Sequence, residues 1–311
     1  MTDRMENGFH FLSRGKDEEF LRVDSDTLDR LPKYVEKIAD CGLSFSRYSG
    51  YRENDLKLLT RKEFAAVRRI HIQDPIQDIS ALYQLPSMRK LWISTAPGGV
   101  DLTHFPLLEE LEVEWNKNVA GFDALRNLNA LILRKYLSPS GGLSNLRLPS
   151  RVKSLRIIQG NINNLSGLEH LPIERLMLAY LPKLVDLSVI LSFRKSLTKL
   201  NLDTCKRVSG INPLLASLTA LQTLRLSSIA PMPDLSFVPK LSVLKFFSFV
   251  HTEVEDGDMA WLLKHPTLER VGFLRKRNFS HSYEEICAAL ANRSDKSKSS
   301  ELRKPKKSAS K

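Results

Sequence analysis

The apolar residues of the chain follow one recurrent pattern: an apolar residue, any two residues, an apolar residue, any one residue and a third apolar residue. Ten copies begin at Val67, Met88, Leu108, Leu128, Val152, Ile173, Leu197, Leu221, Leu241 and Leu268. Successive copies begin 20 to 27 residues apart. A period kept over so many copies indicates a repeat architecture, because composition alone would produce no regular spacing.

Each copy predicts a short β-strand followed by a returning segment. Several returning segments carry apolar residues at steps of three, as in Ile79, Leu82 and Leu85, and again in Leu165, Leu168 and Leu171. Steps of three suit short 3₁₀ or helical turns with one apolar side. One such strand cannot bury its leucines alone, so neighbouring copies must stack and share one ladder of apolar side chains.

Two copies extend the pattern by three residues: LEELEVEWN, which ends at Asn116, and LTKLNLDTC, which ends at Cys205. In this, residues 67–273 resemble the leucine-rich-repeat family, whose unit reads LxxLxLxxN/C. The short units resemble the bacterial and intracellular subtypes of 20–24 residues. The resemblance implies an α/β solenoid, shaped as a horseshoe or arc. It also implies a parallel β-sheet on the concave face and short 3₁₀ or helical segments on the convex face.

The segments outside the repeats are predicted to cover the two ends of the solenoid. Residues 1–66 are expected to form an N-terminal cap: a hairpin around residues 14–17, a helix over residues 28–38 and a degenerate repeat near residues 43–48. The repeats occupy residues 67–274. Residues 275–293 are expected to form a C-terminal cap helix that starts with a Ser282–Glu285 capping box. The Ser/Lys-rich residues 294–311 read as a disordered basic tail.

The net charge of +12 divides into two parts. Residues 275–311 hold 11 basic and 4 acidic residues, a net charge of +7, which leaves +5 for residues 1–274. Side chains alternate across a strand, so the residues before, between and after the last two apolar positions of each copy should face away from the core. These positions contain nine basic and four acidic residues, and so account for the remaining +5.

This concave surface is the predicted partner-binding site. Exposed aromatic and arginine residues together are typical of binding hot spots, and an extended concave surface suits a protein ligand. Trp92 and Met177 are the expected apolar anchors. The expected site residues are Arg69, Lys90, Trp92, Glu110, Glu112, Glu114, Ile132, Arg134, Arg156, Arg175, Met177, Lys199, Arg225, Lys245 and Phe247.

The sequence offers no sign of catalysis. Phosphate-binding loops, dinucleotide fingerprints, nucleophile elbows and zinc-protease motifs are absent, and the seven histidines lack metal-ligand spacing. We therefore predict no catalytic residue, no cofactor and no metal. No apolar run is long enough for a signal peptide or a membrane span, and three distant cysteines fit reduced thiols, which favours the cytoplasm. The KPKK sequence would permit a nuclear location in a eukaryote.

These features predict a non-catalytic recognition module that binds an acidic protein partner on its concave surface. Regulator, effector and immunity-type inhibitor are three roles that fit this mechanism equally well. The alternative is a nucleic-acid-associated protein that uses the basic concave surface and the Lys-rich tail to contact phosphates. The sequence leaves the partner and the oligomeric state open.

Overall fold

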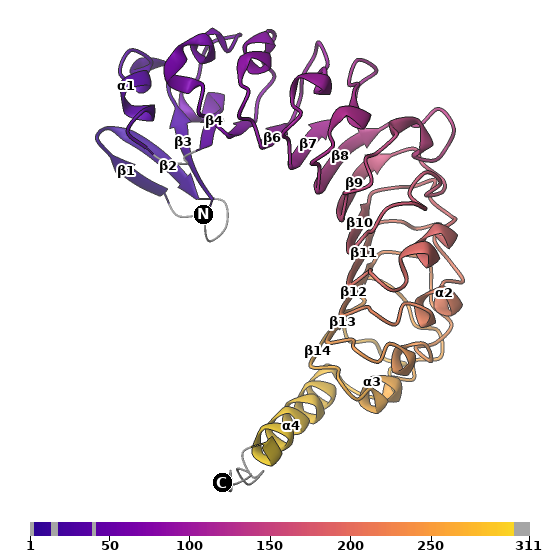
Figure 1. Ribbon diagram of the computed structural model, residues 1–311. Coiled ribbons are helices and arrows are strands. Elements are labelled where there is room, and N and C mark those ends of the chain that lie inside the picture. The colour runs from indigo at the N-terminus through magenta and orange to yellow at the C-terminus, as the bar shows by residue number, and fades with distance from the viewer. Residues whose placement is uncertain (1–2, 14–17, 39–41, 302–311) are drawn as a thin grey trace, which may run out of the picture. The chain divides into compact units, whose positions relative to one another are not determined.

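A computed structural model describes residues 3–13, 18–38 and 42–301 of the chain (Figure 1). The chain forms two compact units. Unit 1 comprises residues 1–162 and 166–173, and unit 2 comprises residues 163–165 and 174–311. Both units are built from the same repeat.

Unit 1 holds nine strands in its described residues. They are β1 (Asp3–Glu6), β2 (Phe9–Ser13), β3 (Glu19–Val23), β4 (Gly42–Phe45), β5 (Arg69–Ile72), β6 (Lys90–Ile93), β7 (Glu110–Glu114), β8 (Ala130–Tyr136) and β9 (Ser154–Gly160). The first three pair antiparallel, and each strand from β3 to β8 pairs in parallel with the next. The parallel sheet thus begins before residue 67.

Unit 2 continues the repeat with five parallel strands. They are β10 (Arg175–Ala179), β11 (Lys199–Asp203), β12 (Thr223–Ser227), β13 (Phe246–Ser248) and β14 (Arg270–Gly272). The α-helices of unit 2 are α2 (Asn212–Ala216), α3 (Ala260–Lys264) and α4 (Tyr283–Glu301). Figure 1 shows α2 and α3 on one side of these strands. The exposed and half-buried side chains of β10, β11 and β12, most of them polar, lie on the other face of these strands.

The returning segments are short turns of 3₁₀ helix, as the steps of three predict. In unit 1 they are η1 (Ser25–Thr27), η2 (Arg47–Ser49), η3 (Lys57–Thr60), η4 (Lys62–Phe64), η5 (Ser80–Gln84), η6 (Leu102–His104), η7 (Phe122–Ala124) and η8 (Ser144–Leu146). Unit 2 has η9 (Ser188–Phe193) and η10 (Val238–Lys240). Strand β7 shows the resulting core: Leu111 and Val113 are buried, and the three glutamates between and beside them are only half-buried. We call this side of each sheet, opposite the core, the polar sheet face.

A left-handed backbone residue recurs at or near the end of six consecutive repeat strands, β8 to β13. In each repeat this residue directly follows the last position of the polar sheet face. The six residues have φ between 51° and 63°; they are Lys135, Gln159, Tyr180, Thr204, Ser228 and His251. Non-glycine residues adopt this conformation singly and at a cost of about 1–2 kcal/mol. Its recurrence at one repeat position gives an independent marker of the repeat register.

That marker corrects the predicted register of one repeat. The pattern assigned to Leu241 places Lys245 and Phe247 on the polar sheet face, but Phe247 is fully buried and pairs with the core residue Leu224. The run from Leu241 to Val250 has enough apolar residues to fit two registers. The observed register starts the copy at Leu244, which spaces it more evenly between its neighbours and places Phe247 and Phe249 in the core.

The ends of the chain differ in detail from the expectation. Strands β2 and β3 pair antiparallel on either side of residues 14–17, the expected hairpin turn, which lies outside the described residues. Helix α1 (Leu31–Val35) is shorter than the helix expected over residues 28–38. Helix α4 continues to Glu301, beyond the expected end of the cap helix at residue 293. The rest of the expected tail, residues 302–311, lies outside the described residues.

Candidate functional site

The polar sheet face of unit 1 neutralises its own acidic strand. The Nζ of Lys90 on β6 lies 2.9 Å from Oε1 of Glu110 on β7 and also pairs with Glu18, which precedes β3. Burial alone would lower the pKa of Lys90, but its bonds to the two carboxylates outweigh burial and raise that pKa. Lys90 is therefore held as a cation within the fold, and much of its charge is already compensated.

The other two glutamates of β7 are also paired. On β8, Nε of Arg134 donates to Oε1 of Glu112 at 2.6 Å. The Nζ of Lys135 lies 2.9 Å from Oε2 of Glu114. Sequence reasoning missed Lys135, because strict alternation assigns it to the other face, whereas its left-handed backbone breaks the alternation. The acidic strand is thus a set of cross-strand ion pairs, which are modest contributors to stability.

Trp92 does not serve as an exposed anchor, contrary to the prediction. Its side chain is only 7% exposed and belongs to a cluster with Leu12 and Phe20 from the N-terminal antiparallel strands. The Phe20 and Trp92 ring centroids lie 5.3 Å apart. Arg69 is also buried, with its guanidinium 5.8 Å from the centroid of Phe20. The N-terminal strands therefore cover this part of the polar sheet face, which residues 67–274 alone could not reveal.

The remaining predicted residues of unit 1 are Ile132, which is half-buried on β8, and Arg156, which is exposed on β9. Arg156 has no ion pair with any carboxylate of the described residues. A cavity of about 420 Å³ opens beside Trp92 and the Glu112–Arg134 pair. Among the predicted site residues of unit 1 that the structure describes, Arg156 is thus an exposed cation outside any ion pair, and the hollow beside Trp92 has mixed charge.

The polar sheet face of unit 2 has the opposite character. Four cations stand on it: Arg175 on β10, Lys199 on β11, Arg225 on β12 and Arg270 on β14. All are exposed, and none forms an ion pair with a carboxylate of the described residues. The face also holds the half-buried Met177 and one carboxylate, Asp203, which accepts a hydrogen bond from Oγ1 of Thr204 at 2.9 Å.

Phe246 connects two of these cations. The register aligns Thr223, Phe246 and Arg270 on neighbouring strands. The guanidinium carbon of Arg225 lies 5.1 Å from the Phe246 ring centroid, and that of Arg270 lies 5.5 Å from it. Both distances suit cation–π contacts. Sequence reasoning missed Phe246 because the shifted register of β13 placed Lys245 and Phe247 on this face instead.

The two residues displaced by that shift have other surroundings. Lys245 precedes β13 and is exposed, with its Nζ 3.7 Å from Oε1 of Glu269. Phe247 lies in the core, where its ring centroid is 5.8 Å from that of Phe237 and 5.1 Å from that of Phe249. Neither residue belongs to the candidate surface.

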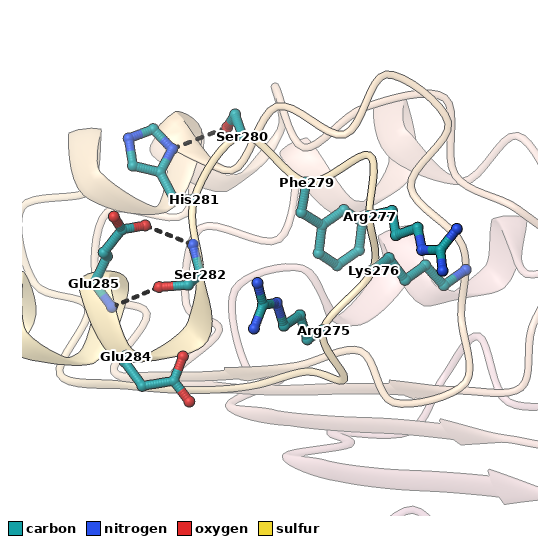
Figure 2. A pocket seen from close by; sticks show the side chains of 9 residues that line it. All are labelled: Arg275, Lys276, Arg277, Phe279, Ser280, His281, Ser282, Glu284 and Glu285. Carbon is teal, nitrogen blue, oxygen red and sulfur yellow. Dashed lines mark hydrogen bonds between the residues drawn. The ribbon is translucent and has the colours of Figure 1, made fainter.

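More positive charge lies at the C-terminal end of unit 2. A cavity of about 860 Å³ lies at the start of α4. Figure 2 shows the side chains that line it: Arg275, Lys276, Arg277, Phe279, Ser280, His281, Ser282, Glu284 and Glu285. The expected capping box is confirmed: Ser282 N–H donates to the Glu285 carboxylate at 2.7 Å, and Glu285 N–H donates to Ser282 Oγ at 3.1 Å. The cap thereby satisfies two backbone donors at the start of α4.

The described residues outside this surface include one buried thiol, that of Cys205. Cys205 is fully buried, and burial raises the pKa of its thiol to about 11, so the thiol is not a ready nucleophile. In the described residues, no group of three His, Cys, Asp or Glu side chains could hold a metal ion. No helix of the described residues has both the length and the apolar character needed to cross a membrane.

Comparison with known proteins finds similarity in structure. No protein-family model matches the chain, and neither does the sequence of any curated protein. The solved structure of the internalin InlF from Listeria monocytogenes is similar over 86% of this chain and 79% of its own, with 18% identity and a TM-score of 0.56. A leucine-rich-repeat protein of Leptospira interrogans is similar over 71% of this chain and 63% of its own, with 17% identity and a TM-score of 0.49.

The likeness to the internalin concerns the fold, because so few residues are identical. It agrees with the parallel strands and short 3₁₀ turns within each unit, and with the spacing of the repeat along the sequence. From its repeats and this likeness, the chain has a leucine-rich-repeat fold.

Proposed function

We propose that the chain is a non-catalytic recognition module that binds an acidic surface of another protein on the polar sheet face of unit 2. The observation that carries the proposal is the set of four exposed cations on that face, none paired with a described carboxylate. They contrast with the paired glutamates of unit 1. Unpaired cations on one rigid face attract an acidic partner and speed its association.

The fold supports a binding role. Strand pairing fixes the positions of the side chains before a partner arrives, and this lowers the entropy cost of association. A regulator, an effector and an immunity-type inhibitor would all use this mechanism. The proposal includes a cytoplasmic location, which the free thiols of Cys205 and Cys287 support.

The test is affinity purification of the full chain from its native host, with and without nuclease, followed by reconstitution with the purified co-eluting protein. The double variant Arg175→Glu/Lys199→Glu should weaken binding of an acidic partner by about a hundredfold or more, since two attractions become repulsions. The control Arg194→Glu/Lys195→Glu changes the charge equally on exposed residues after η9, away from the polar sheet face. It should bind like the wild type.

Two results would count against this function. If the variant and its control weaken binding equally, the polar sheet face of unit 2 is not the site. If nuclease abolishes all capture, and removal of residues 294–311 does the same, the chain instead associates with nucleic acid through its C-terminal end.

A further inference from the structure

We propose that the acidic element recognised by unit 2 is one face of an α-helix, which lies across strands β10–β14 at a steep angle to them. This inference rests on the proposed function and adds the shape of the ligand. It follows from the positions of the four cations in the strand register and from the contacts of Phe246.

The register places the cations in a row perpendicular to the strands. Arg175 pairs with Lys199, which is followed across the sheet by Thr223, Phe246 and Arg270. Neighbouring strands are about 4.8 Å apart. The row therefore carries positive charge at Arg175, at Lys199 about 5 Å from it, and at Arg270 about 19 Å from it.

The fourth cation reaches this row because of the aromatic ring. Arg225 stands two residues further along β12 than Thr223, so its Cα lies to one side of the row. Its guanidinium nevertheless lies 5.1 Å from the centroid of Phe246, which is in the row. The ring thus holds the charge of Arg225 near the row, and the strand of Arg225 lies two strand spacings, or about 10 Å, from that of Arg175. Phe246 is a positioning residue for both Arg225 and Arg270.

An α-helix matches this spacing. Side chains at i and i+4 lie about 5–6 Å apart on one helix face. Those at i+7 and i+14 lie about 10.5 and 21 Å from the first, since each residue rises 1.5 Å. An extended segment presents same-face side chains every 6.6 Å or so, and so departs from the second and third cations by about 2 and 3 Å, whereas the helix departs by about 2 Å at its i+14 position and by about 1 Å or less at the others. Carboxylates at i, i+4, i+7 and i+14 of a helix would therefore meet all four cations together.

The experiment uses two stapled, Ala-rich helical peptides of identical composition, each with four glutamates and a fluorescent label. One places the glutamates at i, i+4, i+7 and i+14, and the other distributes them around the helix. Fluorescence anisotropy with the full chain should show about tenfold tighter binding of the first peptide, because it alone can form all four ion pairs. Arg225→Gln should remove this preference, and the matched control Arg194→Gln should preserve it.

Phe246→Leu tests the positioning role. Leucine keeps an apolar side chain in place but removes the π face that holds the two guanidiniums. The preference for the patterned peptide should fall severalfold while the circular dichroism spectrum stays unchanged. An unchanged preference in Phe246→Leu would overturn the role of the ring.

Failure of this inference is distinguishable from failure of the proposed function. If both peptides bind equally and Arg175→Glu/Lys199→Glu weakens both, the acidic ligand stands and the helix is wrong. The same holds if a proline-interrupted acidic peptide of equal composition binds more tightly than the helix. If neither peptide nor the co-purified partner responds to these variants, both proposals fail.

Discussion

The ring of Phe20 lies directly over Gly42, so close that a Cβ built on the glycine would be 2.4 Å from two ring carbons and 3.1 Å from Cβ of Arg69. The two residues pair across β3 and β4. The missing side chain of Gly42 is what lets Phe20 reach across the polar sheet face toward Trp92. The glycine at the first position of β4 thus marks a close approach between neighbours.

Gly42→Ala should therefore destabilise unit 1. The added methyl group overpacks the site, which lowers the free energy of unfolding by about 1–3 kcal/mol. Displacement of Phe20 should also expose Trp92 and shift the tryptophan emission to longer wavelength. Urea denaturation and fluorescence spectra measure the two effects. Gly98→Ala is the control, because a Cβ there meets no atom within 4 Å, and a loss of stability equal to that of Gly42→Ala would refute the steric account.

The corrected register of β13 predicts unequal effects at neighbouring positions. Phe247→Ala should lower the free energy of unfolding by about 3–5 kcal/mol, since it removes a fully buried ring. Lys245→Ala and Val243→Ala should change it by only about 0.5 kcal/mol, because both side chains are exposed. Thermal or urea unfolding of the three variants measures this. The register expected from sequence requires Phe247 to be the tolerant position, so similar losses in all three would contradict the observed strand.

The sequence alone predicted the parallel repeat strands, because each repeat must bury its apolar residues against the next and so keeps their spacing. It could not choose between the two registers around Phe246 and Phe247, since both alternations in that run are apolar. Nor could it show that Trp92 is buried, because the covering residues Leu12 and Phe20 are far from it in sequence. Such contacts depend on tertiary packing and leave no periodic signal.

The sequence predicted which charged residues lie on the candidate surface, but not which of them form ion pairs with one another. The sequence predicted Glu110, Glu112 and Glu114 on one strand between strands that carry basic residues. In the structure these glutamates form ion pairs with basic side chains of the two neighbouring strands. Pairing depends on side-chain reach and on local backbone, as Lys135 illustrates. The unpaired cations of unit 2 emerge only when these pairs are known.

The buried His265 should make stability depend on pH. Its Nε2–H donates to the Leu241 carbonyl at 2.7 Å, and its Nδ1 accepts from Thr267 N–H at 3.2 Å, so both nitrogens are satisfied in the neutral ring. Burial lowers the pKa of His265 below 6.5; the bond to Leu241 opposes this shift, and the nearby Arg293 adds to it. The unfolded chain therefore takes up a proton near pH 6.5, before the folded chain does.

The sign of the effect follows from this order. The stabilisation due to neutral His265 is complete above about pH 6.5 and decreases as the pH falls toward the lower pKa of the folded state, by at most about 1.4 kcal/mol per pH unit. Urea denaturation between about pH 5 and 8 should show this slope in the wild type and less of it in His265→Gln. The exposed His10→Gln is the control and should keep the slope. Parallel pH profiles of wild type and His265→Gln would rule out this role.

The left-handed residues that end the repeat strands predict a stabilising substitution. Gln159 has φ 63° and an exposed side chain. Gln159→Gly removes a strain of about 1–2 kcal/mol but adds unfolded-state entropy worth about 0.5–1 kcal/mol, so the free energy of unfolding should rise by up to about 1.5 kcal/mol. Gln159→Val should lower it, because β-branched residues tolerate positive φ poorly.

The exposed Gln222, whose φ is not positive, provides the control: Gln222→Gly should destabilise by about 0.5–1 kcal/mol. Urea denaturation compares the three variants, and an equal loss in the two glycine variants would show that position 159 stores no backbone strain.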